Sequence, residues 1–206
     1  MRWLAKLVWA IAALVGLATI AVGVWMMQAG IGTRTPPGSL ETRVARTARH
    51  ALIPAAARNR SNPAAATPDI IREGMEHWAD HCATCHGNDG GGDTEIGLGL
   101  SPRAPDMRTP ATQNLSDGEL FYIIENGVKL TGMPAWGNGT AEGEESSWHL
   151  VHFIRHLPKL SDAEIADMEA LNPRGPDEWR AQEDEQKFLA GENASPSAPA
   201  PHGHKH

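Results

Sequence analysis

The stretch Cys82-Ala83-Thr84-Cys85-His86 decides how the rest of this chain is understood. Two thiols separated by two residues and followed at once by an imidazole form the attachment signature of a c-type haem. The thiols add to the two haem vinyl groups as thioethers, and a short helical turn lets both of them reach. The histidine then lies beneath the ring, where its nitrogen can bind the iron. The motif therefore predicts one covalent haem c, attached at Cys82 and Cys85 and ligated by His86.

Three other kinds of site can contain two cysteines at this spacing. A thioredoxin-type redox motif expects a βαβ context, and no clear strand pattern surrounds this one. A zinc site needs further ligands, but these are the only 2 cysteines in the chain. A structural disulfide remains an alternative in an oxidising compartment.

Charge is divided unevenly along the 206 residues, whose net charge is −7. Residues 1–68 carry 8 basic and 1 acidic side chains, whereas residues 69–157 carry 5 basic and 14 acidic ones. Residues 158–206 carry 5 basic and 10 acidic side chains. An acidic domain argues against nucleic-acid binding and predicts a partner with a basic docking surface.

The first 30 residues predict a transmembrane anchor or a signal peptide. Leu7 to Met27 contains no charge over 21 residues, which is long enough for a membrane-spanning helix. The run is longer than an ordinary signal sequence and no Ala-x-Ala site closes it, which favours an uncleaved anchor. Several arginines follow the span, and the positive-inside rule would keep such a segment in the cytoplasm.

Residues 31–68 form a basic arm. Pro36, Pro37 and Gly38 interrupt the chain, and Ser39 could cap a helix after them. That helix would carry an apolar stripe beside a basic flank, formed by Leu40, Val44 and Ala51 and by Arg43, Arg46 and Arg49 respectively. It could lie on anionic lipid headgroups, fold back on the acidic domain, or belong to a solvated linker that ends at Pro68.

Residues 69–83 have the apolar periodicity of a helix that leads into the cysteine motif. Gly74 would weaken this helix, and a close crossing by another helix would explain its presence. His77 and His81 precede the attachment turn on the same helix. They are therefore expected at the surface or at its boundary rather than on the iron.

With this helix and motif, residues 69–157 resemble the monohaem class I cytochromes c. The resemblance implies an all-α fold around one covalently bound haem, within a haem domain spanning residues 69–158. It also implies electron exchange with redox protein partners. Because haem is attached outside the bacterial inner membrane in that family, it implies a single-pass protein with its haem domain in the periplasm.

The resemblance also implies further roles in the haem site. A proline carbonyl accepts a hydrogen bond from the proximal histidine in that family, and either Pro105 or Pro102 could do so here. Met133, in a Gly-Met-Pro turn, corresponds to the distal iron ligand, with Met107 as its rival. Trp136 could pack near the haem edge.

The other helices of the domain follow from their capping signals. Ser116 and Glu119 form a capping box for a middle helix that Gly127 ends. Residues 137–145 predict a polar loop, after which Ser146 or Ser147 would cap a last helix that reaches about residue 157. On that helix lie three histidines at metal-ligand spacing, which more often are partly solvated: His149, His152 and His156.

Residues 159–190 predict an acidic helical extension whose first helix has Ser161 and Glu164 as its capping box. The composition of residues 191–206 predicts a disordered tail. The tail ends in a histidine-rich group that could bind copper, nickel or zinc, formed by His202, His204 and His206.

These patterns favour an electron carrier without catalytic residues, since a six-coordinate iron leaves no open site for a substrate. One alternative is a haem-based sensor with a labile or missing Met133 ligand, or a periplasmic metal-handling protein that uses the histidine-rich tail. Another is a subunit of a larger redox complex in which the haem is only a relay.

Overall fold

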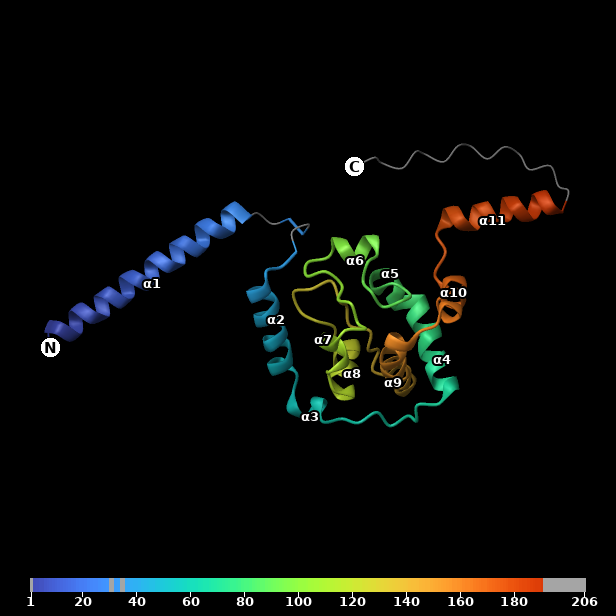
Figure 1. The fold of residues 1–206 in the computed structure, drawn as a ribbon, viewed down its shortest axis with the longest axis horizontal. Helices are drawn as coiled ribbons and strands as arrows, with labels where there is room; N and C mark the ends of the chain where they lie inside the picture. The colour runs from blue at the N-terminus through green and yellow to red at the C-terminus, as the bar shows by residue number, and fades with distance from the viewer. Residues whose placement is uncertain (1, 30–31, 34–35, 191–206) are drawn as a thin grey trace.

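The computed structural model describes residues 2–29, 32–33 and 36–190, and this part of the chain contains helices and no strands. The predicted all-α class is confirmed. Figure 1 shows α4 and α9 crossing in the globular part, from which α1 and α11 extend. The helices are α1 (Arg2–Ala29), α2 (Ser39–Leu52), α3 (Ala55–Arg58), α4 (Pro68–His77), a π-helical turn (Trp78–Cys82), α5 (Ala83–His86), α6 (Glu95–Gly99), α7 (Pro110–Gln113), α8 (Asp117–Asn126), α9 (Ala141–His156), a 3₁₀ turn (Leu157–Lys159), α10 (Asp162–Leu171) and α11 (Pro176–Leu189).

The core forms where α4 crosses α9 at Gly74. A side chain at this position would collide with the backbone carbonyl of His149 and lie 2.9 Å from Cβ of Phe153. The predicted close crossing is therefore confirmed. Large side chains from both sides are almost fully buried around it, among them Trp78, Leu150 and Phe153.

The helix that leads into the cysteine motif extends slightly beyond the predicted range of residues 69–83. Thr67 caps it, because its hydroxyl oxygen accepts a hydrogen bond from the Ile70 N–H at 3.3 Å. The residues from Trp78 to Cys82 form a π-helical turn. Such a turn inserts one residue into the helical register and changes the direction of the side chains that follow.

The capping predictions for the middle helix and for the first helix of the extension were right, and the one for α9 was wrong. Ser116 and Glu119 form the predicted box on α8, and Ser161 and Glu164 form the one on α10. Gly127 ends α8 with a φ of 64°. The helix α9, however, begins at Ala141, with neither Ser146 nor Ser147 as its cap.

The cap of α9 is Thr140, whose hydroxyl oxygen accepts a hydrogen bond from the Gly143 N–H at 3.0 Å. Glu142 and Glu144 occupy the first turn, where negative charge interacts favourably with the helix dipole. The predicted loop over residues 137–145 is therefore wrong for its second half.

The basic arm folds back on the domain. Nδ1 of His50 lies 2.5 Å from Oε1 of Glu119, and Ile53 is only 4% exposed. Further along, the Asn62 amide donates to the Trp148 carbonyl at 2.9 Å. The end of the arm is thus packed rather than a solvated linker. The predicted Ser39 cap is wrong, since Gly38 occupies the cap position without a side-chain bond.

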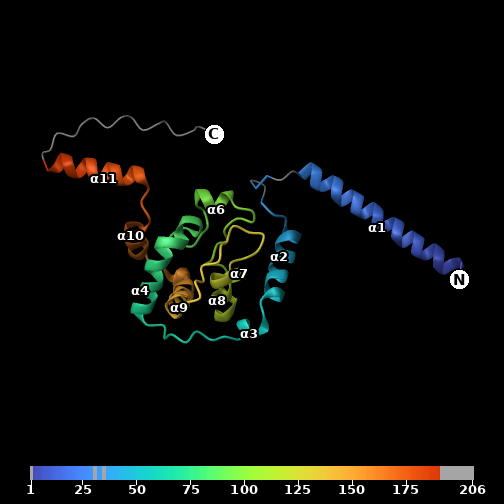
Figure 2. The ribbon, with the colours of Figure 1, turned by 180° about the vertical axis from the view of Figure 1, so that it is seen from behind.

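The helix α1 is exposed along its length and apolar enough to cross a membrane over Arg2–Trp25, although a signal sequence would have the same properties. The acidic extension forms α10, which buries Met168, and α11. Figure 2 shows these two helices on the side of the globular part opposite to α2. The predicted disorder and metal binding of residues 191–206 lie outside the described residues.

The Glu119 carboxylate gives the stability of the domain a pH dependence. Burial alone would raise its pKa, but hydrogen bonds from Ser116 and the His50 ring lower the pKa below the ordinary glutamate value. A lowered pKa stabilises the fold above the pKa of the unfolded chain, and this contribution disappears as the pH falls through the folded value.

We therefore expect the urea concentration at the unfolding midpoint of the haem-loaded protein to decrease as the pH is lowered from about 6 to about 3. Glu119→Gln should make this midpoint less dependent on pH. The matched control is Glu145→Gln, which changes an exposed carboxylate. A pH profile that Glu119→Gln leaves unchanged would show that other groups carry the effect.

Candidate functional site

The cysteine motif lies where the π-helical turn meets α5. Cys82 ends the π turn, Cys85 and His86 belong to α5, and Gly87 ends the helix with a φ of 73°. Both cysteines are half-buried free thiols. Burial and the neighbouring Cys85 raise the pKa of Cys82 to about 12. Cys82 is therefore a neutral thiol at neutral pH, unlike the low-pKa nucleophile of a thioredoxin-type site.

Backbone carbonyls of the motif are held by three neighbouring groups. The Trp78 indole N–H donates to the Gly87 carbonyl at 3.0 Å, and the Gly92 N–H donates to the His86 carbonyl at 2.8 Å. The Thr94 hydroxyl lies 2.9 Å from the Thr84 carbonyl and 3.1 Å from the Cys85 carbonyl. These bonds hold the turn that carries both thiols and the imidazole.

Thr94 also builds the segment that covers the turn. Its oxygen accepts a hydrogen bond from the Gly97 N–H at 2.9 Å and so caps α6. A side chain at Gly97 would collide with the Cys85 carbonyl, and one at Gly92 with the Ala104 carbonyl at 2.5 Å. The glycines after His86 therefore allow the chain to return closely over the attachment turn.

The surroundings of the His86 ring favour its neutral form, which is the form that can bind a metal. It packs against Trp78 with ring centroids 5.6 Å apart. Burial lowers its pKa, and the Pro105 carbonyl opposes this shift. Nδ1 is buried without a partner at hydrogen-bonding geometry. Of the two prolines that the sequence left open, the one whose carbonyl acts on the His86 ring is thus Pro105.

Met133 lies in a loop whose backbone is held in place. Its carbonyl accepts from the Val128 N–H at 3.1 Å, and its own N–H donates to the Thr131 hydroxyl at 3.1 Å. At the end of the loop, the Trp136 ring stacks on His81 at 5.3 Å, with 9° between their planes. The stack places the methionine loop beside the residue that precedes Cys82.

The other candidate methionine has a structural role. Met107 packs against the hydrophobic core, and its carbonyl accepts a hydrogen bond from the Gln113 amide at 2.8 Å. Met133 is half-buried and outside that core. This difference favours Met133 as the ligand, which stays a prediction.

The three histidines of α9 do not converge on one point. His149 lies 2.9 Å from a Glu73 oxygen, His152 contacts the Ala64 carbonyl, and His156 lies 2.7 Å from Glu164. Among the described residues, no group of three His, Cys, Asp or Glu side chains could hold a metal ion. The metal site suggested by their spacing is therefore not formed, because each ring points to a different partner.

The residues of the turn fit a c-type haem. Two thiols and a half-buried imidazole lie within one short helical segment, and Nδ1 of the imidazole is buried without a partner at hydrogen-bonding geometry. Exposed apolar side chains lie nearby, since α6 packs on α5 and carries Ile96 and Leu98. Cys82, Cys85, His86 and Met133 would hold such a group.

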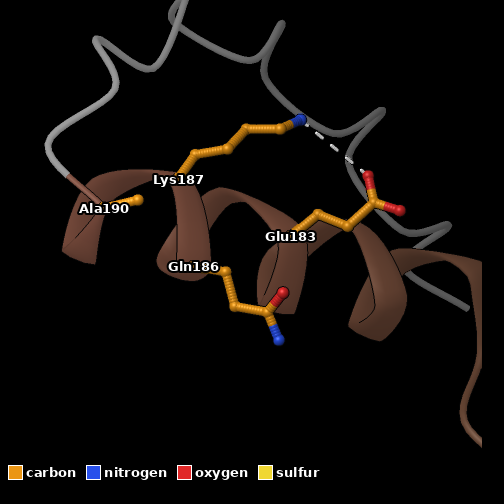
Figure 3. Close-up of a pocket in the computed structure, with 4 residues that line it drawn as sticks. All are labelled: Glu183, Gln186, Lys187 and Ala190. Atoms are coloured by element: carbon orange, nitrogen blue, oxygen red, sulfur yellow. Dashed lines mark ion pairs between the residues drawn. The ribbon is translucent and has the colours of Figure 1, made fainter.

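A separate shallow pocket on α11 offers no comparable chemistry. Figure 3 shows its lining by three residues of α11 and the residue that follows the helix: Glu183, Gln186, Lys187 and Ala190. The Lys187 ammonium and the Glu183 carboxylate lie 3.9 Å apart and neutralise each other. We assign no function to this pocket.

The sequence had not indicated Thr94 or the indole of Trp78 as supports of the turn. The pattern Thr94-Glu95-Ile96-Gly97 contains a helix-capping residue, which was a usable signal for α6. The hydrogen bonds from Thr94 to the motif carbonyls depend on the folded path of the loop and have no local signature.

Comparison with known proteins supports the assignment of this turn to a c-type haem. A family model described as "Cytochrome C oxidase, cbb3-type, subunit III" matches residues 69–154. No curated protein matches the chain.

The hydroxyl of Thr94 generates a testable expectation. Thr94→Val keeps the size of the side chain but leaves two carbonyls of the attachment turn without this donor. We expect a loss of about 1–3 kcal/mol in the free energy of unfolding, measured with urea on the haem-loaded protein. Thr94→Ser, which keeps the hydroxyl, should recover most of it. Equal losses in both variants would mean that the methyl group rather than the hydrogen bonds matters.

Proposed function

Because residues 69–154 form a class I c-type cytochrome domain, we propose that this protein carries single electrons between redox partners through a haem held by His86 and Met133. The observation that carries the proposal is the attachment turn itself. It holds two thiols and a half-buried imidazole within one helical segment, with the backbone of the methionine loop beside it. The bound haem supplies reversible one-electron chemistry at its iron.

In this function, the residues around the proposed haem site hold and orient the ligands of the iron. Burial keeps His86 neutral, so that its nitrogen is available as a ligand. The Pro105 carbonyl acts on the His86 ring, and a hydrogen bond from the ring to that carbonyl would orient the ring and increase its basicity as a ligand. Met133 supplies a thioether, which raises the reduction potential relative to a second histidine. The electron carrier needs no residue that transfers a proton.

We place the haem domain at the periplasmic face of a bacterial inner membrane, anchored by α1. The support is the apolar span of 24 residues over Arg2–Trp25, which has a mean hydropathy of 2.4 and is not buried in the fold. A helix of that length can cross the hydrocarbon core. The arginines after the span favour the opposite orientation, but attachment of a haem c favours export.

We also propose that the partner presents a basic docking surface. Residues 69–157 carry 14 acidic and 5 basic side chains. Exposed carboxylates precede the attachment turn on α4 and on the π-helical turn after it, and they belong to Asp69, Glu73, Glu76 and Asp80. Complementary charge speeds the encounter of redox proteins and selects among them.

The ligand role of Met133 is tested by the visible spectrum. The oxidised wild-type protein should show the weak long-wavelength sulfur–iron charge-transfer band, and Met133→Ala should lose it because the thioether is removed. Met107→Leu is the matched control and should keep the band. If Met133→Ala keeps the band and Met107→Leu loses it, the assignment is reversed. A wild-type protein without the band, or one that readily binds carbon monoxide when reduced, would favour the sensor alternative.

The proposed docking charge is tested by salt. The second-order rate of electron exchange with a basic redox protein should fall by about tenfold as the ionic strength rises from about 0.01 M to about 0.15 M. Exchange with an acidic redox protein of similar potential serves as the control and should not slow. A rate with the basic protein that is independent of ionic strength would contradict the proposal.

A further inference from the structure

The helix α2 has two different faces. Thr42 and Arg49, seven residues apart, are partly buried toward the domain, and Ile53 is buried directly after the helix. The bond between His50 and Glu119 at 2.5 Å holds this end of the helix to α8. One face of α2 therefore lies against the haem domain.

The opposite face of α2 is apolar and exposed. Leu40 is 69% exposed and Val44 is 60% exposed. They belong to a shallow groove along the helix, lined by Leu40, Arg43, Val44, Thr47, Ala48 and Ala51. The positions of Leu40, Val44, Thr47 and Ala51 follow the spacing i, i+4, i+7 and i+11, which places them in one stripe. We call this stripe, together with Arg43 beside it, the outer face of α2.

The outer face has the composition of a helix that lies in a membrane interface. Such helices place an apolar stripe at the boundary between headgroups and acyl chains, while arginines beside it attract anionic lipids. Arg43 and Arg46 are both exposed. The only acidic residue of α2 is Glu41, which is not next to either arginine on the helix surface.

The position of α2 in the chain keeps it close to the bilayer. The helix α1 ends at Ala29 and α2 begins at Ser39. The 9 intervening residues can span at most about 32 Å when fully extended. Figure 1 shows α2 along the side of the globular part from which the chain leads to α1.

We propose that α2 lies on the anionic lipid surface next to the anchor, with its outer face toward the lipid and its other face on the haem domain. This inference rests on the membrane anchoring proposed above. Because α2 is joined to α8 through His50 and Glu119, its contact with lipid would set the orientation of the haem domain relative to the bilayer.

The test is hydrogen exchange of the full-length, haem-loaded protein in lipid nanodiscs. The two lipid compositions are pure phosphatidylcholine and a mixture that contains anionic phosphatidylglycerol. Amides of residues 39–52 should exchange about tenfold more slowly in the anionic discs than in the neutral ones. The double variant Leu40→Glu/Val44→Glu should lose this protection.

The matched control is Leu52→Glu. Leu52 belongs to the same helix and is 79% exposed, but it lies outside the stripe, so this variant should keep the protection. Protection of the amides of α1 in the same discs reports insertion of the anchor. If α1 is protected while residues 39–52 exchange equally in both kinds of disc, the inference about α2 is wrong and the anchoring stands.

Three other results would also overturn the inference. Equal loss of protection in Leu52→Glu and in the double variant would show that the stripe has no special role. Protection that appears only when a protein partner is added would assign the outer face to a protein rather than to lipid. If α1 itself is not protected, the anchoring proposal and the α2 inference fail together.

Discussion

The rest of the structure depends on the close crossing of α4 and α9 at Gly74. No side chain fits there, because the His149 carbonyl and the Phe153 side chain occupy the space next to the Gly74 Cα. The crossing lets Trp78 enter the core, where it packs against Phe153 and is 2% exposed. The indole of Trp78 then binds the Gly87 carbonyl at the end of the attachment turn. Trp78 therefore connects the packed core of α4 and α9 to the turn that carries the thiols.

The attachment turn is rigid on its backbone side, which suits a protein that exchanges electrons. Its carbonyls accept hydrogen bonds from Trp78, Gly92 and Thr94, and groups fixed before a reaction need little rearrangement during it. The methionine loop has its own internal bonds, and the stack of Trp136 on His81 connects it to the turn. Two segments that are far apart in the sequence therefore lie side by side.

Features determined by local chemistry could be predicted from the sequence, whereas those determined by distant contacts could not. The box of Ser116 and Glu119 and the glycine of the crossing have local signals, and both are found. Thr140 was missed as the cap of α9 because a threonine without an acidic partner three residues later is a weak signal. The π turn before Cys82 changes a hydrogen-bond register that apolar periodicity does not encode.

The path of the arm could not be predicted from local sequence patterns, because it depends on contacts with residues far along the chain. Its amphipathic helix was predicted, but its docking depends on a carboxylate 69 residues away, Glu119, which binds His50 and caps α8 at once. A carboxylate that is 4% exposed is costly to bury without such partners. The arm therefore completes the domain on this side. With α1 as the proposed anchor, an arm whose residues 50–62 pack on the domain would restrict the directions that the domain can face more than a flexible linker of the same length would.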